Sequence, residues 1–147
     1  MFARDFVAVA QPFEAVAPRL VRDAGWLDPI AYDAVVDAVG VFSALHPSQP
    51  LALNLPPLAV FCTRGVVRIR DDALVMPLRW NTNVPPAVLP QLTCDLEVAP
   101  LGADRSQVVL SATYHRVETA DHTVRRAVET ALRAFLHGLA SRLRHQG

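Results

Sequence analysis

The amino-acid sequence predicts a single α+β domain in which a curved antiparallel sheet packs against one long C-terminal helix. The spacing of apolar residues changes at Leu58 from a period of about 3.6 to a period of about 2, which indicates a change from helices to strands. Residues 92–117 then alternate strictly and run directly into an amphipathic helix. A chain of 147 residues suits one domain and is short for two. We therefore expect residues 1–147 to form one domain.

The composition limits the classes of function. Apolar residues make up 52% of the chain and charged residues 19%, which is more apolar surface than a solid core of this size needs. The excess could line a cavity or an oligomer interface. Fourteen basic residues balance fourteen acidic ones without forming a basic stripe, which argues against nucleic acid as a partner. All the basic residues are arginine, so Schiff-base chemistry on a lysine is excluded.

No apolar run approaches the roughly 18 residues that a membrane span requires. The N-terminal sequence "MFARDFVAVAQPF" also lacks the uninterrupted apolar region of a signal peptide, because Arg4, Asp5 and Gln11 interrupt it. Cys62 and Cys94 have no metal-binding or redox spacing and are expected to be buried free thiols. These features predict a soluble, cytoplasmic protein without a membrane span.

The first third of the chain predicts one strand and two helices. Residues 2–10 are β-branched and aromatic enough for a strand. A helix then begins near Pro12 and ends near Gly25, and Pro18 inside it predicts a kink or two short pieces.

The second helix begins at Asp28, whose carboxylate can cap free backbone donors, and continues through residue 45. Pro29 fixes φ at the first turn of this helix. A proline-rich connection follows at residues 47–57.

The sheet begins after this connection. Residues 58–65 and 66–70 read as two strands that meet at Gly65. Residues 73–81 form a third strand, with large apolar side chains on one face. Pro77 cannot donate to a ladder, so this strand should be an edge strand or contain a bulge.

The last two strands, around residues 92–98 and 108–115, each have one apolar and one polar face. The C-terminal helix presents a broad apolar stripe, which must cover the apolar face of the sheet. Its members are Val124, Ala127, Val128, Ala131, Leu132, Phe135, Leu136, Leu139, Ala140 and Leu143. On the polar side of this helix, Arg125 is spaced to pair with Glu129.

This order of elements resembles the START-type helix-grip superfamily (SRPBCC), which includes birch-pollen allergens and polyketide cyclase/dehydrase-like proteins. The stretches "LPQLTCDLEVAPLGADRSQVVLSATY" and "DHTVRRAVETALRAFLHGLASRL" resemble small bacterial members of it. The resemblance implies about seven strands wrapped around the last helix, and an apolar cavity that binds lipids, sterols or polyketides. The long second helix and the connection at residues 47–57 depart from the usual pattern.

The candidate ligand-binding residues are large or soft side chains on the faces that should meet. Trp80 and Tyr114 attract attention because their polar atoms need partners once they are buried. Met76 is soft enough to adapt to several ligand shapes. Plain core packing is the competing interpretation for each position. The full set is Phe61, Met76, Trp80, Cys94, Leu96, Tyr114, Val128, Leu132 and Phe135.

A cavity of this kind should not stand empty. A dry void of roughly 300 Å³ costs about 7 kcal/mol, comparable with the ~5–15 kcal/mol total stability of a domain. Water or a ligand would therefore fill it. The leading hypothesis is a binder or carrier of an apolar small molecule.

Two alternatives remain open. The first is an aromatase/cyclase-type enzyme in which Tyr114, Arg79 or His115 moves a proton. Arg79 shares the outer face with Asp95 and Glu97, however, and a cross-strand ion pair is the simpler expectation. The second alternative is a homodimeric interaction module that uses the apolar excess as its interface.

No catalytic constellation, metal site or cofactor motif is apparent. His115 and His122 flank acidic residues, but their spacing matches no known metal signature. Ser111 with His115 lacks the turn that exposes a hydrolase nucleophile.

Overall fold

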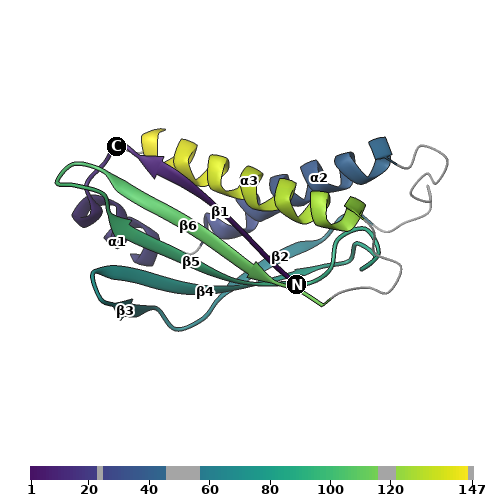
Figure 1. The fold of residues 1–147 in the computed structure, drawn as a ribbon, viewed down its shortest axis with the longest axis horizontal. Helices are drawn as coiled ribbons and strands as arrows, with labels where there is room; N and C mark the ends of the chain where they lie inside the picture. The colour runs from purple at the N-terminus through teal and green to yellow at the C-terminus, as the bar shows by residue number, and fades with distance from the viewer. Residues whose placement is uncertain (23–24, 46–56, 116–121, 146–147) are drawn as a thin grey trace.

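The computed structural model describes residues 1–22, 25–45, 57–115 and 122–145. One antiparallel sheet lies on one side, the long helices α2 and α3 lie together against it, and α1 lies near one end (Figure 1). The predicted α+β helix-grip fold is confirmed. In chain order the elements are β1 (Phe2–Val9), α1 (Phe13–Arg22), α2 (Leu27–Leu45), β2 (Val60–Arg64), β3 (Arg68–Arg70), β4 (Ala73–Thr82), β5 (Leu92–Pro100), β6 (Ser106–Thr113) and α3 (His122–His145).

The described sheet has six strands, where about seven were predicted. Its order is β1-β6-β5-β4-β2, and β3 pairs with β4 beyond the end of β2. Every pairing is antiparallel. We call the face toward α3 the inner face and the opposite face the outer face. Trp80, Cys94 and Ala112 are buried on the inner face, and their neighbours Arg79, Thr93 and Thr113 are exposed on the outer face.

Pro77 lies in an internal strand, so the expectation of an edge strand was wrong. The backbone nitrogen of Gly65 donates to the carbonyl of Pro77 at 2.8 Å. Within a strand, the N–H and C=O of any one residue point toward the same neighbouring strand. The carbonyl of Pro77 points toward Gly65, so an N–H at position 77 would point there too. Here β2 has ended and β3 has not begun. The break around Gly65, which the sequence predicts, therefore accommodates the missing donor.

The helix α3 buries the stripe that the sequence predicts, since all its members except the half-buried Ala140 are at most 4% exposed. On its outer side the predicted pair forms, with Arg125 Nε 3.1 Å from Glu129 Oε1. None of the described helices combines the length and hydropathy that crossing a bilayer requires.

The helix α2 packs directly against α3. Gly138 of α3 lies so close to Ile30 that an added Cβ would be 3.1 Å from the Ile30 Cγ2 atom. The helix α2 also buries three small side chains, which suit a close approach between helices. They are Ala31, Ala34 and Ala38. The two helices therefore form one closed layer over the inner face.

Polar contacts hold the ends of the helices. Asp28 lies in the first turn of α2, where its Oδ1 accepts from the backbone nitrogen of Cys62 at 2.8 Å and joins α2 to β2. Near α1, Gln11 Nε2 and Arg19 Nη1 both donate to the Leu143 carbonyl near the end of α3, at 2.9 and 3.0 Å. A cation is favourable at this end of a helix dipole. The helix α1 contains Pro18 and is one helix, where a kink or two pieces were expected.

Candidate functional site

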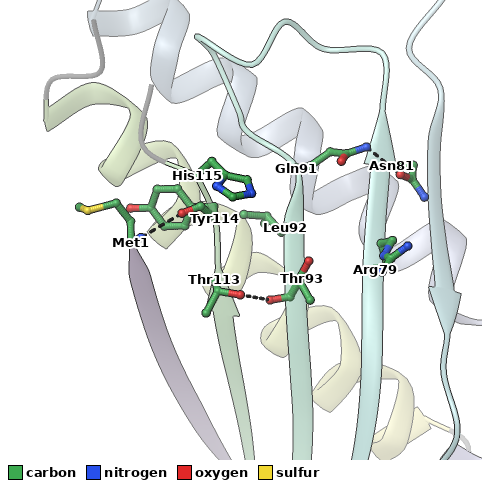
Figure 2. A pocket seen from close by; sticks show the side chains of 9 residues that line it. All are labelled: Met1, Arg79, Asn81, Gln91, Leu92, Thr93, Thr113, Tyr114 and His115. Atoms are coloured by element: carbon green, nitrogen blue, oxygen red, sulfur yellow. Dashed lines mark hydrogen bonds between the residues drawn. The ribbon is translucent and has the colours of Figure 1, made fainter. Parts of the chain in front are cut away.

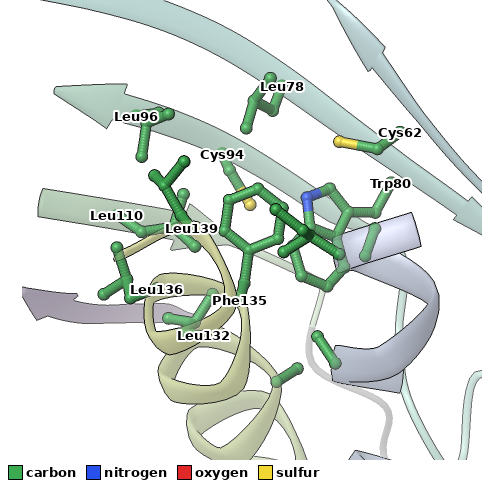
Figure 3. Packing of buried hydrophobic residues seen from close by; sticks show 14 of the residues in the cluster. Cys62, Leu78, Trp80, Cys94, Leu96, Leu110, Leu132, Phe135, Leu136 and Leu139 are labelled. Atoms are coloured by element: carbon green, nitrogen blue, oxygen red, sulfur yellow. The ribbon is translucent and has the colours of Figure 1, made fainter. Parts of the chain in front are cut away.

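Seven of the nine predicted ligand-binding residues come together between the sheet and α3. Figure 3 labels Trp80, Cys94, Leu96, Leu132 and Phe135 among them. Cross-strand pairing sets Met76 beside Leu96, and α3 presses its apolar stripe onto the same rows. We call these seven residues the inner-face cluster. They are Met76, Trp80, Cys94, Leu96, Val128, Leu132 and Phe135.

The inner-face cluster is packed solid. Its members have only 0–1% of their surface accessible, so no space large enough for a water molecule adjoins them. The rings of Trp80 and Phe135 are in contact, with centroids 5.1 Å apart and planes tilted by 42°. The sequence predicts an open cavity at this place, and side chains fill it instead. Filling avoids the cost of a dry void.

The other two predicted residues lie elsewhere. Phe61 is 60% exposed on the outer face, opposite Asn81, so it does not belong to the inner-face cluster. Its neighbours Val60 and Cys62 turn inward, and alternation along β2 therefore points Phe61 outward. Tyr114 is 8% exposed at the end of the apolar core.

Two buried indole groups lack hydrogen-bond partners. The Nε1 atoms of Trp80 and Trp26 are buried, and neither has a partner among the described residues. The Trp26 ring also contacts Phe135, with centroids 6.4 Å apart and planes tilted by 49°. Trp26 was not among the predicted site residues, although an indole two residues before a predicted helix signals a buried side chain with a polar atom to satisfy.

The two cysteines are free and buried. Burial and the nearby Asp28 carboxylate raise the pKa of the Cys62 thiol to about 12. Burial also raises the pKa of Cys94, and the charges of Cys62 and Asp95 add to this effect. Both thiols are therefore protonated at neutral pH and are poor nucleophiles and metal ligands. They serve as soft apolar lining for the inner face.

The side chains of the aromatase/cyclase alternative are not gathered on the inner face. Burial raises the pKa of Tyr114, while the nearby Arg125 lowers it and Glu129 raises it. The charges that act on Tyr114 thus come from the first two turns of α3. Arg79 and His115 are exposed on the outer side of the sheet. The three residues therefore do not meet in the predicted cavity under α3, although all three line one open depression on the outer face.

An open depression of about 670 Å³ lies at one end of the outer face (Figure 2). We call it the outer-face depression. Its amide groups bond to each other, with Gln91 Nε2 donating to Asn81 Oδ1 at 2.8 Å. It is lined by Met1, Arg79, Asn81, Gln91, Leu92, Thr93, Thr113, Tyr114 and His115.

The predicted ion pair of Arg79 with Asp95 or Glu97 does not form. The ion pairs within the described ranges are Arg125–Glu129 and Arg133–Asp5. The register of β4 and β5 sets Arg79 opposite Thr93 and sets Asp95 opposite Pro77, so the opposite charges are not direct neighbours. Alternation along each strand correctly predicts that Arg79, Asp95 and Glu97 share the outer face. It does not determine the register in which β4 and β5 pair.

No protein-family model matches the sequence, and no curated protein sequence is similar to it. Solved structures do match in fold. A START superfamily protein from Mycobacterium smegmatis is 12% identical, with 99% of each chain covered and a TM-score of 0.48. A hypothetical protein from Helicobacter pylori is also 12% identical, covering 97% of this chain and 87% of that chain, with a TM-score of 0.49.

The Zhui aromatase/cyclase from a Streptomyces species is 13% identical, with 99% of this chain and 94% of that chain covered and a TM-score of 0.43. The resemblance to START-type proteins that the sequence predicts is thus found among solved structures. At these identities the likeness concerns the fold alone.

Proposed function

We propose that the protein binds an apolar small molecule between the inner face of the sheet and α3, and that members of the inner-face cluster move aside to admit it. The observation that carries this proposal is the buried Nε1 atom of Trp80, which has no acceptor among the described residues. A buried donor of this kind needs an explanation, and a ligand acceptor is one.

The energetics favour an acceptor from outside the chain. Leaving a buried N–H unsatisfied costs about 1–3 kcal/mol. The donor belongs to a cluster of apolar side chains, which offer it no acceptor. An acceptor on a ligand would recover that free energy and fix the orientation of the ligand.

Hydrophobic burial can drive the required rearrangement. A ligand that buries roughly 300 Å² of apolar surface gains about 7 kcal/mol. Exposing one buried leucine or phenylalanine side chain costs only about 1.5–3 kcal/mol. The lining is also adaptable, because Met76 and Cys94 offer soft sulfur-containing side chains.

The first experiment identifies a bound molecule. The purified protein is extracted with organic solvent, the extract is analysed by mass spectrometry, and thermal shifts are measured across a panel of lipids and aromatic compounds. We expect at least one apolar compound to raise the Tm. An empty extract together with no thermal shift across the panel would contradict the proposal.

Two matched variants locate the binding. Leu132→Ala makes room beneath α3 and should strengthen the binding of small apolar ligands, since engineered apolar cavities take up such molecules. Phe61→Ala removes an exposed ring from the outer face and should leave the affinity unchanged. The reverse pattern would move the site to the outer face.

The homodimeric alternative remains a prediction. Exposed apolar side chains that could serve it include Phe2 and Phe6 on β1, at 62% and 63% exposed. Light scattering at micromolar concentration tests it, because a monomer would remove the need for such an interface.

A cytoplasmic location also remains a proposal. It is supported by the two free thiols, which suit a reducing compartment. Cell fractionation tests it directly.

A further inference from the structure

The packed core contains buried side-chain donors without matching acceptors. Among the described residues, three buried side-chain atoms lack a hydrogen-bond partner, and all three are N–H groups. One belongs to Arg19, whose guanidinium already donates to the Leu143 carbonyl near the end of α3. The other two are the indole nitrogens of Trp26 and Trp80. Of the three, the two indoles belong to residues whose rings contact Phe135.

The two indoles contact one ring. Phe135 projects from α3, and its centroid lies 5.1 Å from that of Trp80 and 6.4 Å from that of Trp26. Figure 3 shows the Phe135 ring against Trp80 and Cys94. The place held by this ring is therefore aromatic in shape and lies beside donors from both the sheet and the helical layer. An aromatic ligand that replaces the ring preserves these stacking contacts.

The core around the Phe135 ring contains no charged side chain, because Arg19 is held at the Leu143 carbonyl and is not a member of the core cluster. The core cluster consists of apolar side chains, and its two thiols are protonated at neutral pH. An ionised ligand group would be buried there without a counter-charge, which is strongly unfavourable. A ligand hydroxyl would bring an additional donor into a space that already has donors in excess. A carbonyl oxygen carries two lone pairs and brings no donor.

This inference rests on the proposed function and specifies its ligand. We infer that the protein selects neutral aromatic molecules with a carbonyl-type acceptor, and that the acceptor takes the N–H of Trp80 while the aromatic body takes the place of the Phe135 ring. Trp80 is the favoured donor because its ring lies closer to Phe135 than that of Trp26 does.

The test uses four probes with one naphthalene skeleton: 2-ethylnaphthalene, 2-acetylnaphthalene, 1-(2-naphthyl)ethanol and 2-naphthoate. Their dissociation constants are measured by calorimetry with the intact protein. The ketone should bind about tenfold more tightly than the hydrocarbon, the equivalent of one net hydrogen bond of about 1.4 kcal/mol. The alcohol should fall between these two, and the carboxylate should bind most weakly.

Two variants test which indole donates to the ketone: Trp80→Phe, and Trp26→Phe as its matched control. In Trp80→Phe the preference for ketone over hydrocarbon should fall from about tenfold to about onefold. In Trp26→Phe most of the preference should remain. The ratio of two dissociation constants on the same variant cancels general changes in packing. The comparison of the four probes on the unaltered protein needs no variant, so it holds even if a variant fails to fold.

NMR gives a direct readout, because the chain contains two tryptophans and hence two indole N–H signals. The ketone should shift the Trp80 indole proton downfield, as a new hydrogen bond does, and the hydrocarbon should not. Binding of all neutral probes with equal affinity would overturn this inference and leave the proposed function standing. Tightest binding of the carboxylate would also overturn the inference. If no probe binds, this inference fails, and the solvent extract with the lipid and aromatic panel decides the proposed function separately.

Discussion

The inner-face cluster and the outer-face depression lie on opposite faces of the same strands, and they differ in every property that matters for binding. The depression is open, measures about 670 Å³ and is lined largely by polar groups such as the bonded Gln91 and Asn81. The inner-face cluster encloses no cavity, yet it contains the unsatisfied indole N–H of Trp80.

The difference shows that the volume of a hollow and an unsatisfied hydrogen-bond donor are separate indications of a binding site. A polar depression open to water is an ordinary surface feature, because water already satisfies its groups. A buried donor without an acceptor has a free-energy cost that only a specific partner removes. For this reason we propose binding at the packed face and not in the outer-face depression.

The strongest test of this comparison is Phe135→Ala. It removes the ring at the centre of the inner-face cluster and should lower the free energy of unfolding by about 3–5 kcal/mol, as measured by urea denaturation. The control Phe61→Ala removes the same ring from a 60% exposed position and should cost far less. Equal effects of the two variants would show that the inner face is not tightly packed.

The second largest effect is expected from alkaline pH, which should lower the free energy of unfolding. The pKa of Cys62 is raised from its ordinary value of 9.0 to about 12, and the pKa of Cys94 is also raised. A raised pKa favours the protonated folded state, so this stability is complete below pH 9 and is lost as the pH rises above it. Each thiol should lower the free energy of unfolding by on the order of 1 kcal/mol by pH ~10.

Urea denaturation at several pH values between about 8 and 10 measures this loss. The double variant Cys62→Ala with Cys94→Ala is the control, because it removes both titrating groups. Its stability should fall much less over the same interval, with Tyr114 as a remaining group whose pKa is raised. A slope equal to that of the unaltered protein would assign the pH dependence to other groups.

A smaller effect is expected at the contact between α2 and α3. Gly138→Leu forces a side chain against Ile30 and should cost about 1–3 kcal/mol, measured by thermal denaturation. Gly40→Leu is the matched control on α2, since an added Cβ there meets nothing within 4 Å. If both variants are equally stable, the two helices separate more easily than the described layer implies.

The smallest effect should come from the outer face. Arg79→Gln removes an exposed guanidinium with no ion-pair partner among the described residues, so stability should change by less than about 0.5 kcal/mol. The affinity for the naphthalene probes should not change. A clear loss of affinity would show that the outer-face depression takes part in binding.

Much of the architecture could be predicted from the sequence. Alternation along β5 assigns Cys94 and Leu96 to the inner face correctly, and the apolar stripe of α3 matches the buried residues of the structure. The pairing of Arg125 with Glu129 was also predicted, because it depends only on spacing along one helix. Alternation along β2 would have excluded Phe61 from the candidate site had it been applied there.

By itself, the sequence determined the order of elements, the face to which most side chains point and the cover that α3 provides. These features depend on neighbours a few residues apart along the chain. Only the tertiary structure decided that α2 closes against α3, that Pro77 lies opposite the break between β2 and β3, and that the indole of Trp26 meets the ring of Phe135. Such outcomes depend on contacts between distant segments and on the volume that each side chain fills, which local periodicity does not encode.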